Sequence, residues 1–592
     1  MSEVQRKMVR WGILVAGLAL VATAFSGYTL LRAPAGSNAV SPKGVSVVAK
    51  SRPEVSGLSD EARKYIWDIE QKAFQISHKA VPALTAALAR KDRDALAEFF
   101  STGFAAQVVS RDSGERIRHG ISEFQMQRAG DQERQNVGRE EFVDWLLSLV
   151  ERFDPRPQAQ LPLLYLSPAQ RDQMDGVWQG TWILRVFGKT SSGGPGETVV
   201  RGQFTAERLP ENFALDRGWI SSWDIEQVVV AQSDRPLMEE VSVHSAIDIG
   251  RLHDNWKVDR TKFSVTPGGV YACDYNRDGL VDLLITDQGF STLYAGRGGA
   301  RFEDVTLKAG LPIEPPQGIS QAGATAFADL DNDGDEYLIL GGLVLENRDG
   351  HFVRRGYVPL LHAVGISVAD YDRDGLVDLY ISNAAPPPNR ATARTSWVDD
   401  ESGLPNQMWR NLGNFQFVDV TDATGTAAGK RSTFTAAWLD ADEDGWPDIY
   451  VINELGPNIL LHNNRNGTFS EVQVGPEHDG FAMGVAAGDV DGDGKIDLYV
   501  GNMFSKAGKR IINNIPPREY PPELVAKMRA FVAGNLLLLN KGAHRFDPSP
   551  DSLVSGVGWA YGTAIVDLDG DGRLDLYSTA GFASFSREEQ DG

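Results

Sequence analysis

One nine-residue phrase, repeated six times between residues 274 and 575, constrains the fold of this chain more than any other feature. Its most regular copy, at 489–497, reads Asp-Val-Asp-Gly-Asp-Gly-Lys-Ile-Asp. Carboxylates at positions 1, 3, 5 and 9 supply hard oxygen ligands, and the glycine at position 6 permits a sharp turn. This is the pattern by which a loop wraps Ca²⁺. The repeat therefore predicts a series of calcium loops.

The candidate metal ligands are the side chains at positions 1, 3, 5 and 9 of each copy. In chain order they are Asp274, Asn276, Asp278 and Asp282; Asp329, Asp331 and Asp333; Asp370, Asp372, Asp374 and Asp378; Asp440, Asp442, Asp444 and Asp448; Asp489, Asp491, Asp493 and Asp497; and Asp567, Asp569, Asp571 and Asp575. Without a cation, carboxylates crowded in this way would repel one another. The second copy has Tyr337 at position 9, with Glu336 beside it. We therefore expect five strong Ca²⁺ sites and a weak or empty one in the second loop.

Position 12 and the flanking residues decide between the two folds that use such loops. An EF-hand needs a bidentate glutamate at position 12 and a helix after it. Here position 12 is Ile, Leu, Ile, Val, Val and Ser in the six copies. Short β-branched and aromatic runs follow the loops, as at 497–501, and these are typical of strands. The unit is therefore strand, calcium loop, strand, and calcium is expected to be a fixed structural ion rather than a switch.

A second hairpin follows most loops. Asparagine and glycine precede an aromatic residue in its turn, at 347–352, 411–417, 464–469 and 540–546. Asparagine and glycine supply positive φ angles, and the aromatic ring packs on the sheet. Four strands per unit is the composition of a propeller blade. We expect a mainly β fold built on a calcium-binding β-propeller with six or seven four-stranded blades, the last one allowed to be incomplete.

These loops and turns resemble FG-GAP (or VCBS) repeats, as found in the propellers of integrin α-subunits. Phrases such as Asp-Leu-Tyr-Val and Asn-Gly-Thr-Phe look most like bacterial relatives of the cartilage acidic protein family. The resemblance covers about residues 266–592 and implies the propeller fold, but it does not identify a ligand. Members of that family carry an ASPIC/UnbV segment after the repeats, and none is present here. Only one strand follows the sixth loop, so either the chain is truncated or residues 236–265 supply strands that close the ring.

The N-terminus predicts a membrane-targeting segment. Arg6, Lys7 and Arg10 precede an apolar run at 11–31, which is long enough to span a bilayer. The preceding positive charge favours an orientation with the rest of the chain outside the cytoplasm. An uncleaved anchor and a cleaved signal peptide, with Ala-Thr-Ala at 22–24 as its cleavage site, both remain open. The expected organisation is a cytoplasmic end at 1–10, an anchor or signal at 11–31, a linker at 32–57, a first domain at 58–235, a connector at 236–265 and the propeller at 266–592.

The first domain reads as helices followed by long strands. Helical spacing covers 59–75, 81–89, 93–100 and 140–153, and period-two patterns cover 177–187, 198–209 and 219–230. This order predicts an α+β domain with a curved sheet. The stretch 87–100 resembles the opening helices of SnoaL-like cones of the nuclear-transport-factor fold. Asp224 and His119 are the residues that a catalytic cone would offer, although structural roles explain them more simply.

Net charge limits the partners. The formal net charge of −22 argues against nucleic acid, because phosphate binding needs a basic surface. Six bound Ca²⁺ would bring that charge to about −10. The single cysteine, Cys273, excludes an intrachain disulfide and is expected to be a small buried residue at a strand end.

The function that fits these features best is an extracytoplasmic, membrane-anchored binding module for a protein or glycan. Its contact candidates are the insertions at 384–404 and 504–532, the second of which contains a predicted helix at 522–531. Two alternatives stay open, namely a lyase-like carbohydrate-active enzyme on a calcium propeller and a purely structural envelope scaffold. No zinc-protease motif, nucleophile elbow or P-loop supports catalysis, so an enzyme is the less favoured reading.

Overall fold

The computed structural model describes residues 58–580, apart from gaps. The gaps are 110–115, 120–121, 129–133, 155, 172, 212, 214–216, 237, 253–267, 288–289, 312–323, 385–402, 455, 473, 476–477 and 550–553. The predicted anchor at 11–31, the linker up to 57 and nearly all of the insertion at 384–404 lie outside the described residues. Within the described part, no helix combines the length and the apolarity that a membrane span requires.

The first domain consists of helices packed on one large sheet. Its helices are α2 (Asp60–Gln75), the π-helix η1 (Ile76–Ala80), α3 (Val81–Arg90), α4 (Arg93–Ala97) and α5 (Arg139–Val150). Its strands are β1 (Phe100–Val109), β2 (Arg116–His119), β3 (Ser122–Arg128), β4 (Arg134–Gly138), β5 (Gln158–Gln160), β6 (Leu163–Pro168), β7 (Trp178–Lys189), β8 (Pro195–Ala206) and β9 (Ile220–Ser233). Ser59 caps α2 by accepting a hydrogen bond from the Ala62 amide, and Asp92 caps α4 in the same way through Ala95.

The sheet runs β2-β3-β9-β8-β7-β5, with β1 joined to β4 and β9 and with β6 joined to β7. Its interior is filled by aromatic rings. Trp182 stacks on Phe204 with ring centroids 3.9 Å apart, and Trp223 meets the same indole edge-on at 5.1 Å. All three are buried. The predicted α+β composition and the long strands β7–β9 are present, but the predicted order of helices and then strands is wrong, because β1–β4 lie between α4 and α5. The resemblance to SnoaL-like cones stays a prediction. Asp224 accepts a hydrogen bond from the Gln107 amide, which is a structural contact; the His119 side chain lies outside the description.

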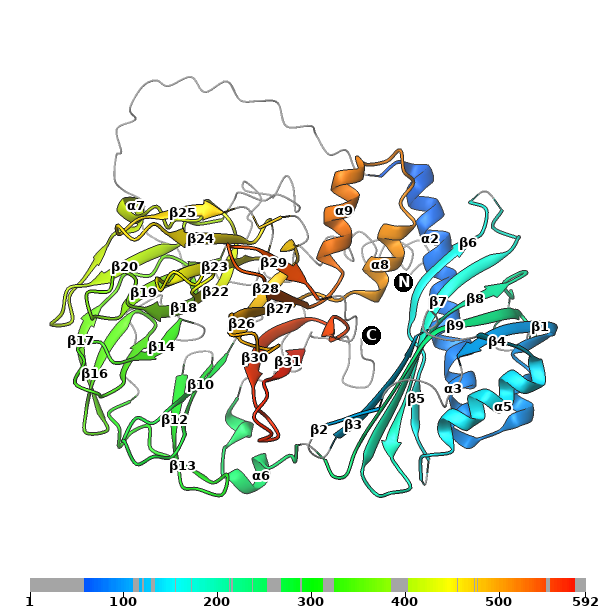
Figure 1. Cartoon of the computed structure of the whole chain (residues 1–592), viewed down its shortest axis with the longest axis horizontal. Coiled ribbons are helices and arrows are strands. Elements are labelled where there is room, and N and C mark those ends of the chain that lie inside the picture. The colour runs from blue at the N-terminus through cyan, green and yellow to red at the C-terminus, as the bar shows by residue number, and fades with distance from the viewer. Residues whose placement is uncertain are drawn as a thin grey trace, which may run out of the picture.

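The rest of the chain forms small antiparallel sheets arranged around a common centre (Figure 1). Blade 1 is β10 (Gly269–Cys273), β11 (Asp282–Asp287), β12 (Phe290–Gly296) and β13 (Phe302–Asp304); blade 2 is β14 (Thr325–Ala328), β15 (Tyr337–Leu340), β16 (Leu343–Arg348) and β17 (His351–Tyr357); blade 3 is β18 (Ala363–Ala369), β19 (Asp378–Asn383), β20 (Gln407–Asn411) and β21 (Phe417–Asp419). Blade 4 is β22 (Thr433–Leu439), β23 (Asp448–Asn453), β24 (Ile459–Asn463) and β25 (Phe469–Val472); blade 5 is β26 (Ala482–Gly488), β27 (Asp497–Asn502), β28 (Leu536–Asn540) and β29 (Phe546–Pro548). The short helix α7 (Thr421–Thr424) follows β21.

The expected count of six or seven four-stranded blades is wrong for the described residues. They form five four-stranded sheets and one two-stranded sheet of β30 (Ala560–Val566) and β31 (Asp575–Ala580). The prediction allowed the last blade to be incomplete, and the described residues hold only the two strands that flank the sixth loop. The described part of the connector folds into the short helices α6 (Ser242–Ser245) and η2 (Ile249–Arg251) rather than into a strand of blade 1.

The second strand of each blade explains how neighbouring blades pack. Every residue of β23 is buried, and its side chains alternate between two faces. Ile449 and Val451 pack with Tyr380 and Met408 of blade 3, whereas Tyr450 and Ile452 pack toward blade 5. A strand that is buried on both faces reads as a continuous apolar run, which matches this sequence. Cys273 is buried at the end of β10 as predicted, and burial raises the pKa of its thiol to about 12.

The second insertion joins the propeller to the first domain. It forms α8 (Lys506–Asn513) and α9 (Pro522–Phe531), as predicted for 522–531, and Figure 1 shows both helices beside α2. Arg510 forms a bidentate ion pair with Glu70 of α2 at 3.0 and 3.1 Å and donates to the Leu163 carbonyl at 2.7 Å. Asn514 donates to the Leu166 carbonyl at 2.9 Å. Arg510 and Asn514 are therefore committed to the contact between the domains, and ligand contact by the rest of this insertion stays a prediction.

Candidate metal centres

The six acidic loops connect the first and second strands of the blades. Position 9 begins the second strand, as Asp282 does in β11 and Asp497 in β27. The position-6 glycines all have positive φ angles between 79° and 90°. Position 4 is also left-handed, as at Arg277 (φ 55°) and Glu443 (φ 64°). These angles curl the loop, and at position 6 glycine adopts them without the steric cost of a Cβ atom.

Hydrogen bonds inside each loop aim the carboxylates. In the fifth loop, Asp489 Oδ1 accepts from the Asp493 amide at 3.1 Å and Oδ2 accepts from the Gly494 amide at 3.0 Å. The same pair of bonds to position 1 occurs in the first, third, fourth and sixth loops. The loops are thus shaped by their own backbone amides. A metal ion would find the carboxylates already turned to one side.

The carboxylates at positions 1, 3 and 5 converge. In the second to fifth loops, one ligand atom from each of the three aspartates lies within 4.8 Å of the others. In the first loop Asn276 replaces one carboxylate, and its amide donates to Asp278 at 3.0 Å. Carboxylates crowded in this way repel one another, a cost that a cation would remove, so the donor set fits a hard divalent ion.

In the first, third, fourth and fifth loops, the position-9 aspartate is the most buried member of the set. Asp282, Asp378 and Asp497 are fully buried. The two oxygens of Asp378 accept from the Asn411 amide at 2.8 Å and the Tyr371 amide at 3.3 Å, which ties the loop to the third strand. Burial raises the pKa of Asp378 to about 7 and also raises the pKa of Asp282, Asp448 and Asp497. A bound cation would favour the ionised form of each.

The second loop differs in a way that explains its missing ninth carboxylate. The Tyr337 hydroxyl donates to Asp331 Oδ2 at 2.9 Å and to Asp333 Oδ2 at 3.3 Å. A hydrogen-bond donor therefore lies among the oxygens that would otherwise face an ion. Glu336 does not replace the ligand, because its Oε2 accepts from the Asp274 amide of the first loop at 3.3 Å. The hydroxyl group of Tyr337 thus holds the second loop together through these hydrogen bonds.

Sequence reasoning assigned the blade asparagines only to turns and missed their main role. They end or nearly end the third strand of blades 2 to 5, and each is buried: Asn347, Asn411, Asn463 and Asn540. The Asn463 amide donates to the Tyr371 carbonyl in the loop of blade 3 at 2.9 Å and to the Pro447 carbonyl in its own loop at 3.2 Å. The other three bridge the preceding loop and their own in the same way. Each of these asparagines therefore joins the loops of two neighbouring blades by hydrogen bonds, and we call the four residues the clip asparagines.

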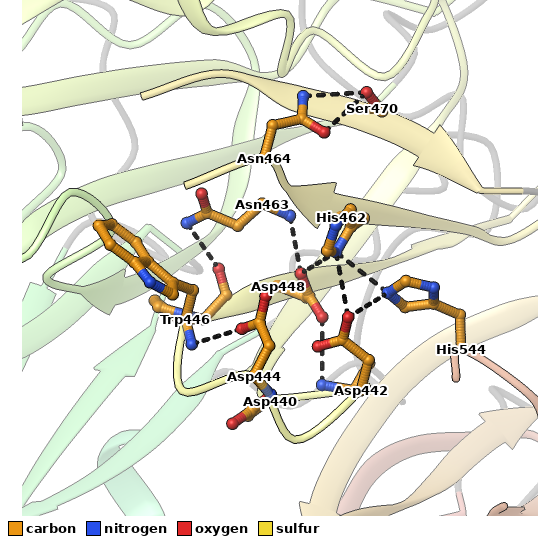
Figure 2. Close-up of polar contacts among 12 residues, drawn as sticks. Asp440, Asp442, Asp444, Trp446, Asp448, His462, Asn463, Asn464, Ser470 and His544 are labelled. Carbon is orange, nitrogen blue, oxygen red and sulfur yellow. Dashed lines mark hydrogen bonds and ion pairs between the residues drawn. The ribbon is translucent and has the colours of Figure 1, made fainter. Parts of the chain in front are cut away.

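Replacing Asn463 with alanine is expected to destabilise the propeller by about 2–3 kcal/mol, because it leaves two carbonyls without their buried donor. The neighbouring Asn464 is the matched control, since its amide bonds only to Thr468 and Ser470 beside it (Figure 2). Asn464→Ala should change stability by less than about 0.5 kcal/mol. Urea unfolding of both variants at saturating Ca²⁺ measures the difference, and equal losses would contradict the clip.

Basic side chains also reach some loops. Arg410 lies 2.8 Å from Asp372 Oδ2 and 2.9 Å from Asp374 Oδ2, so its charge partly offsets the negative charge of the third loop. Lys541 lies 3.5 Å from Asp491 in the fifth loop. The loops therefore differ in net charge. Two histidines that the sequence analysis did not single out, His462 and His544, reach the fourth loop.

Comparison with known proteins agrees with this architecture. A profile described as an FG-GAP-like repeat matches residues 274–340 and 440–500. Cartilage acidic protein 1 of Mus musculus is 29% identical over 268 residues, which cover 39% of this chain and 40% of that protein. The Homo sapiens protein is 24% identical over 270 residues, covering 39% of each. The chain thus spans about two-fifths of the length of the curated relatives it matches. These matches confirm the predicted FG-GAP repeats and the predicted similarity to cartilage acidic protein.

Solved structures are also similar, at lower identity. One of them is an Agrocybe aegerita lectin described by its specific recognition of non-reducing terminal N-acetylglucosamine, and it is 18% identical. The alignment covers 54% of this chain and 75% of the lectin chain, with a TM-score of 0.33.

Proposed function

We propose that this protein, an FG-GAP β-propeller similar to cartilage acidic protein 1, is an extracytoplasmic interaction module whose propeller is stabilised by calcium. Its partner is a protein or a glycan. The likeness to cartilage acidic protein favours a location outside the cell or at its surface. The apolar run at 11–31 would serve as the anchor or the signal that brings it there.

The observation that carries this proposal is the joining of the acidic loops through the clip asparagines. Asn463 spans from the loop of blade 3 to that of blade 4, so an ion in one loop also braces its neighbour. Calcium would be held by positions 1, 3, 5 and 9 of the first, third, fifth and sixth loops. Its contribution is charge neutralisation and rigidity. A rigid platform loses little entropy on binding, which suits an interaction module.

The experiment that tests the interaction role measures ligand binding directly. The labelled protein is applied to a glycan array and to a panel of extracellular-matrix proteins, with Ca²⁺ or with EDTA. We expect a defined glycan or protein signal that EDTA removes. Absence of binding on both panels by a Ca²⁺-loaded, folded protein would contradict the interaction role and leave a structural scaffold in its place.

The special structure of the second loop gives a paired prediction. Asp491→Ala in the fifth loop is expected to remove one bound Ca²⁺, because it takes away one oxygen ligand from a complete ligand set. Asp331→Ala at the same position of the second loop should leave the stoichiometry unchanged, because Tyr337 already occupies that loop. Isothermal titration calorimetry of chelated protein with CaCl₂ counts the sites. Loss of one Ca²⁺ in both variants would show that the second loop also binds.

A further inference from the structure

The fourth loop receives two imidazoles from two different blades (Figure 2). His462 belongs to β24 of blade 4, and His544 lies in the turn between β28 and β29 of blade 5. Both side chains are 22% exposed, and His544 has a φ of 62°, so its backbone is left-handed. They face Asp442, at position 3 of the loop, and Asp448, at position 9.

Four ligand atoms meet at this point. His462 Nδ1 lies 3.1 Å from Asp448 Oδ1, 3.9 Å from Asp442 Oδ2 and 3.0 Å from His544 Nε2. His544 Nε2 lies 3.2 Å from Asp442 Oδ2. In a tetrahedral zinc site, bonds of about 2.0–2.2 Å place neighbouring ligand atoms about 3.3–3.6 Å apart. The observed separations fall on both sides of that value, so a small shift of each side chain would close the site.

The other described blades do not repeat this arrangement. Arg410 directly precedes the clip asparagine of blade 3, just as His462 directly precedes that of blade 4. Its guanidinium forms ion pairs with two aspartates of the third loop. Phe415 occupies the place in blade 3 that His544 has in blade 5, and its ring packs 5.5 Å from Tyr337. The remaining residues before a clip asparagine are Glu346 in blade 2 and Leu539 in blade 5. The fourth loop is thus the one described loop approached by two imidazoles.

The two carboxylates are already oriented toward the imidazoles. Asp442 Oδ2 faces both of them, and the Asp442 side chain is only 17% exposed. Asp448 is almost fully buried and is held in place by the Asn463 and Ala441 amides at 2.7 and 3.1 Å. The site therefore combines two preoriented carboxylates with two nitrogen donors. Calcium selects oxygen ligands, while imidazole suits zinc and related transition ions.

We propose that Asp442, Asp448, His462 and His544 form a transition-metal site of the Zn²⁺ class, which the fourth loop uses in place of calcium. The ligands come from both sides of the boundary between blades 4 and 5, so the ion cross-links two blades. This goes beyond the proposed calcium role of the other loops and uses different donor atoms.

The test uses the full chain at saturating Ca²⁺, so that oxygen-only loops are filled before zinc is added. Titration with ZnCl₂ is expected to show one site of high affinity. His462→Ala and His544→Ala should each weaken it by at least about 100-fold, because each removes a direct ligand. His351→Ala is the control, since His351 is an exposed residue at the start of β17 in blade 2, and its Nδ1 lies 3.2 Å from the Lys308 carbonyl oxygen. Equal zinc binding by all four proteins would overturn the proposal.

X-ray absorption at the zinc edge examines the unaltered protein and does not depend on how the variants fold. Two imidazole nitrogens and two oxygens around one ion are expected. A shell of oxygens alone would overturn the site. Calcium binding at the other loops is measured in the same samples, so loss of the zinc site with intact calcium binding separates this inference from the proposed function.

Discussion

Removing divalent cations with EDTA is expected to lower the melting temperature of the propeller by about 20 °C. A site held at one hundred times its dissociation constant contributes about 2.7 kcal/mol, so five filled loops contribute about 14 kcal/mol. For some 300 residues the entropy of unfolding converts this free energy into a shift of roughly that size. Differential scanning calorimetry with Ca²⁺ and Zn²⁺ present, and then with EDTA, measures the change.

Calcium re-addition provides the control for this experiment. It should restore most of the shift if the loops fold back around the ion, whereas Mg²⁺ should restore little, because it demands a tighter octahedral shell and gives up its water reluctantly. An unchanged melting temperature in protein shown by elemental analysis to be free of metal would contradict a stabilising role for the ions.

Replacing Arg510 with alanine is expected to cost about 3–5 kcal/mol of stability. Its guanidinium and the carboxylate of Glu70 are each 13% exposed, so the change leaves a largely buried charge without its partner. It also removes the donor of the Leu163 carbonyl. Because this contact joins α8 to the first domain, faster limited proteolysis between the two domains should accompany the loss. Guanidinium unfolding and a trypsin time course measure both effects.

Arg518 provides a matched control within the same insertion. It pairs with Glu61 of α2 at 3.5 Å, but the side chains are 76% and 84% exposed. Exposed ion pairs contribute little, so Arg518→Ala should change stability by less than about 0.5 kcal/mol. Similar losses in the two variants would show that the insertion helices do not depend on the buried pair.

Much of the propeller was predictable because its signals are local. The acidic loops, the strands that flank them and the helix at 522–531 depend on residues close together in sequence. The position-12 residues excluded an EF-hand without any tertiary information. The missing ninth carboxylate at Tyr337 also anticipated that the second loop is different, and the phenol contact supplies the physical reason.

The remaining features depend on which blades become neighbours. Asn463 contacts a carbonyl 92 positions earlier, and His544 meets His462 across 82 positions. Neither separation can be derived from strand periodicity. The docking of Arg510 on Glu70 spans 440 positions. These contacts place part of the second insertion against the first domain and turn an assumed calcium loop into a candidate zinc site.

The most direct test of the central claim is the metal content of the purified full chain. After dialysis against buffer with Ca²⁺ and trace Zn²⁺, plasma mass spectrometry should find about four Ca²⁺ and one Zn²⁺ per chain. The first, third, fifth and sixth loops would each hold one Ca²⁺, the fourth would hold Zn²⁺, and the second would hold no ion. A folded protein that retains neither ion would contradict the account of the acidic loops as metal sites.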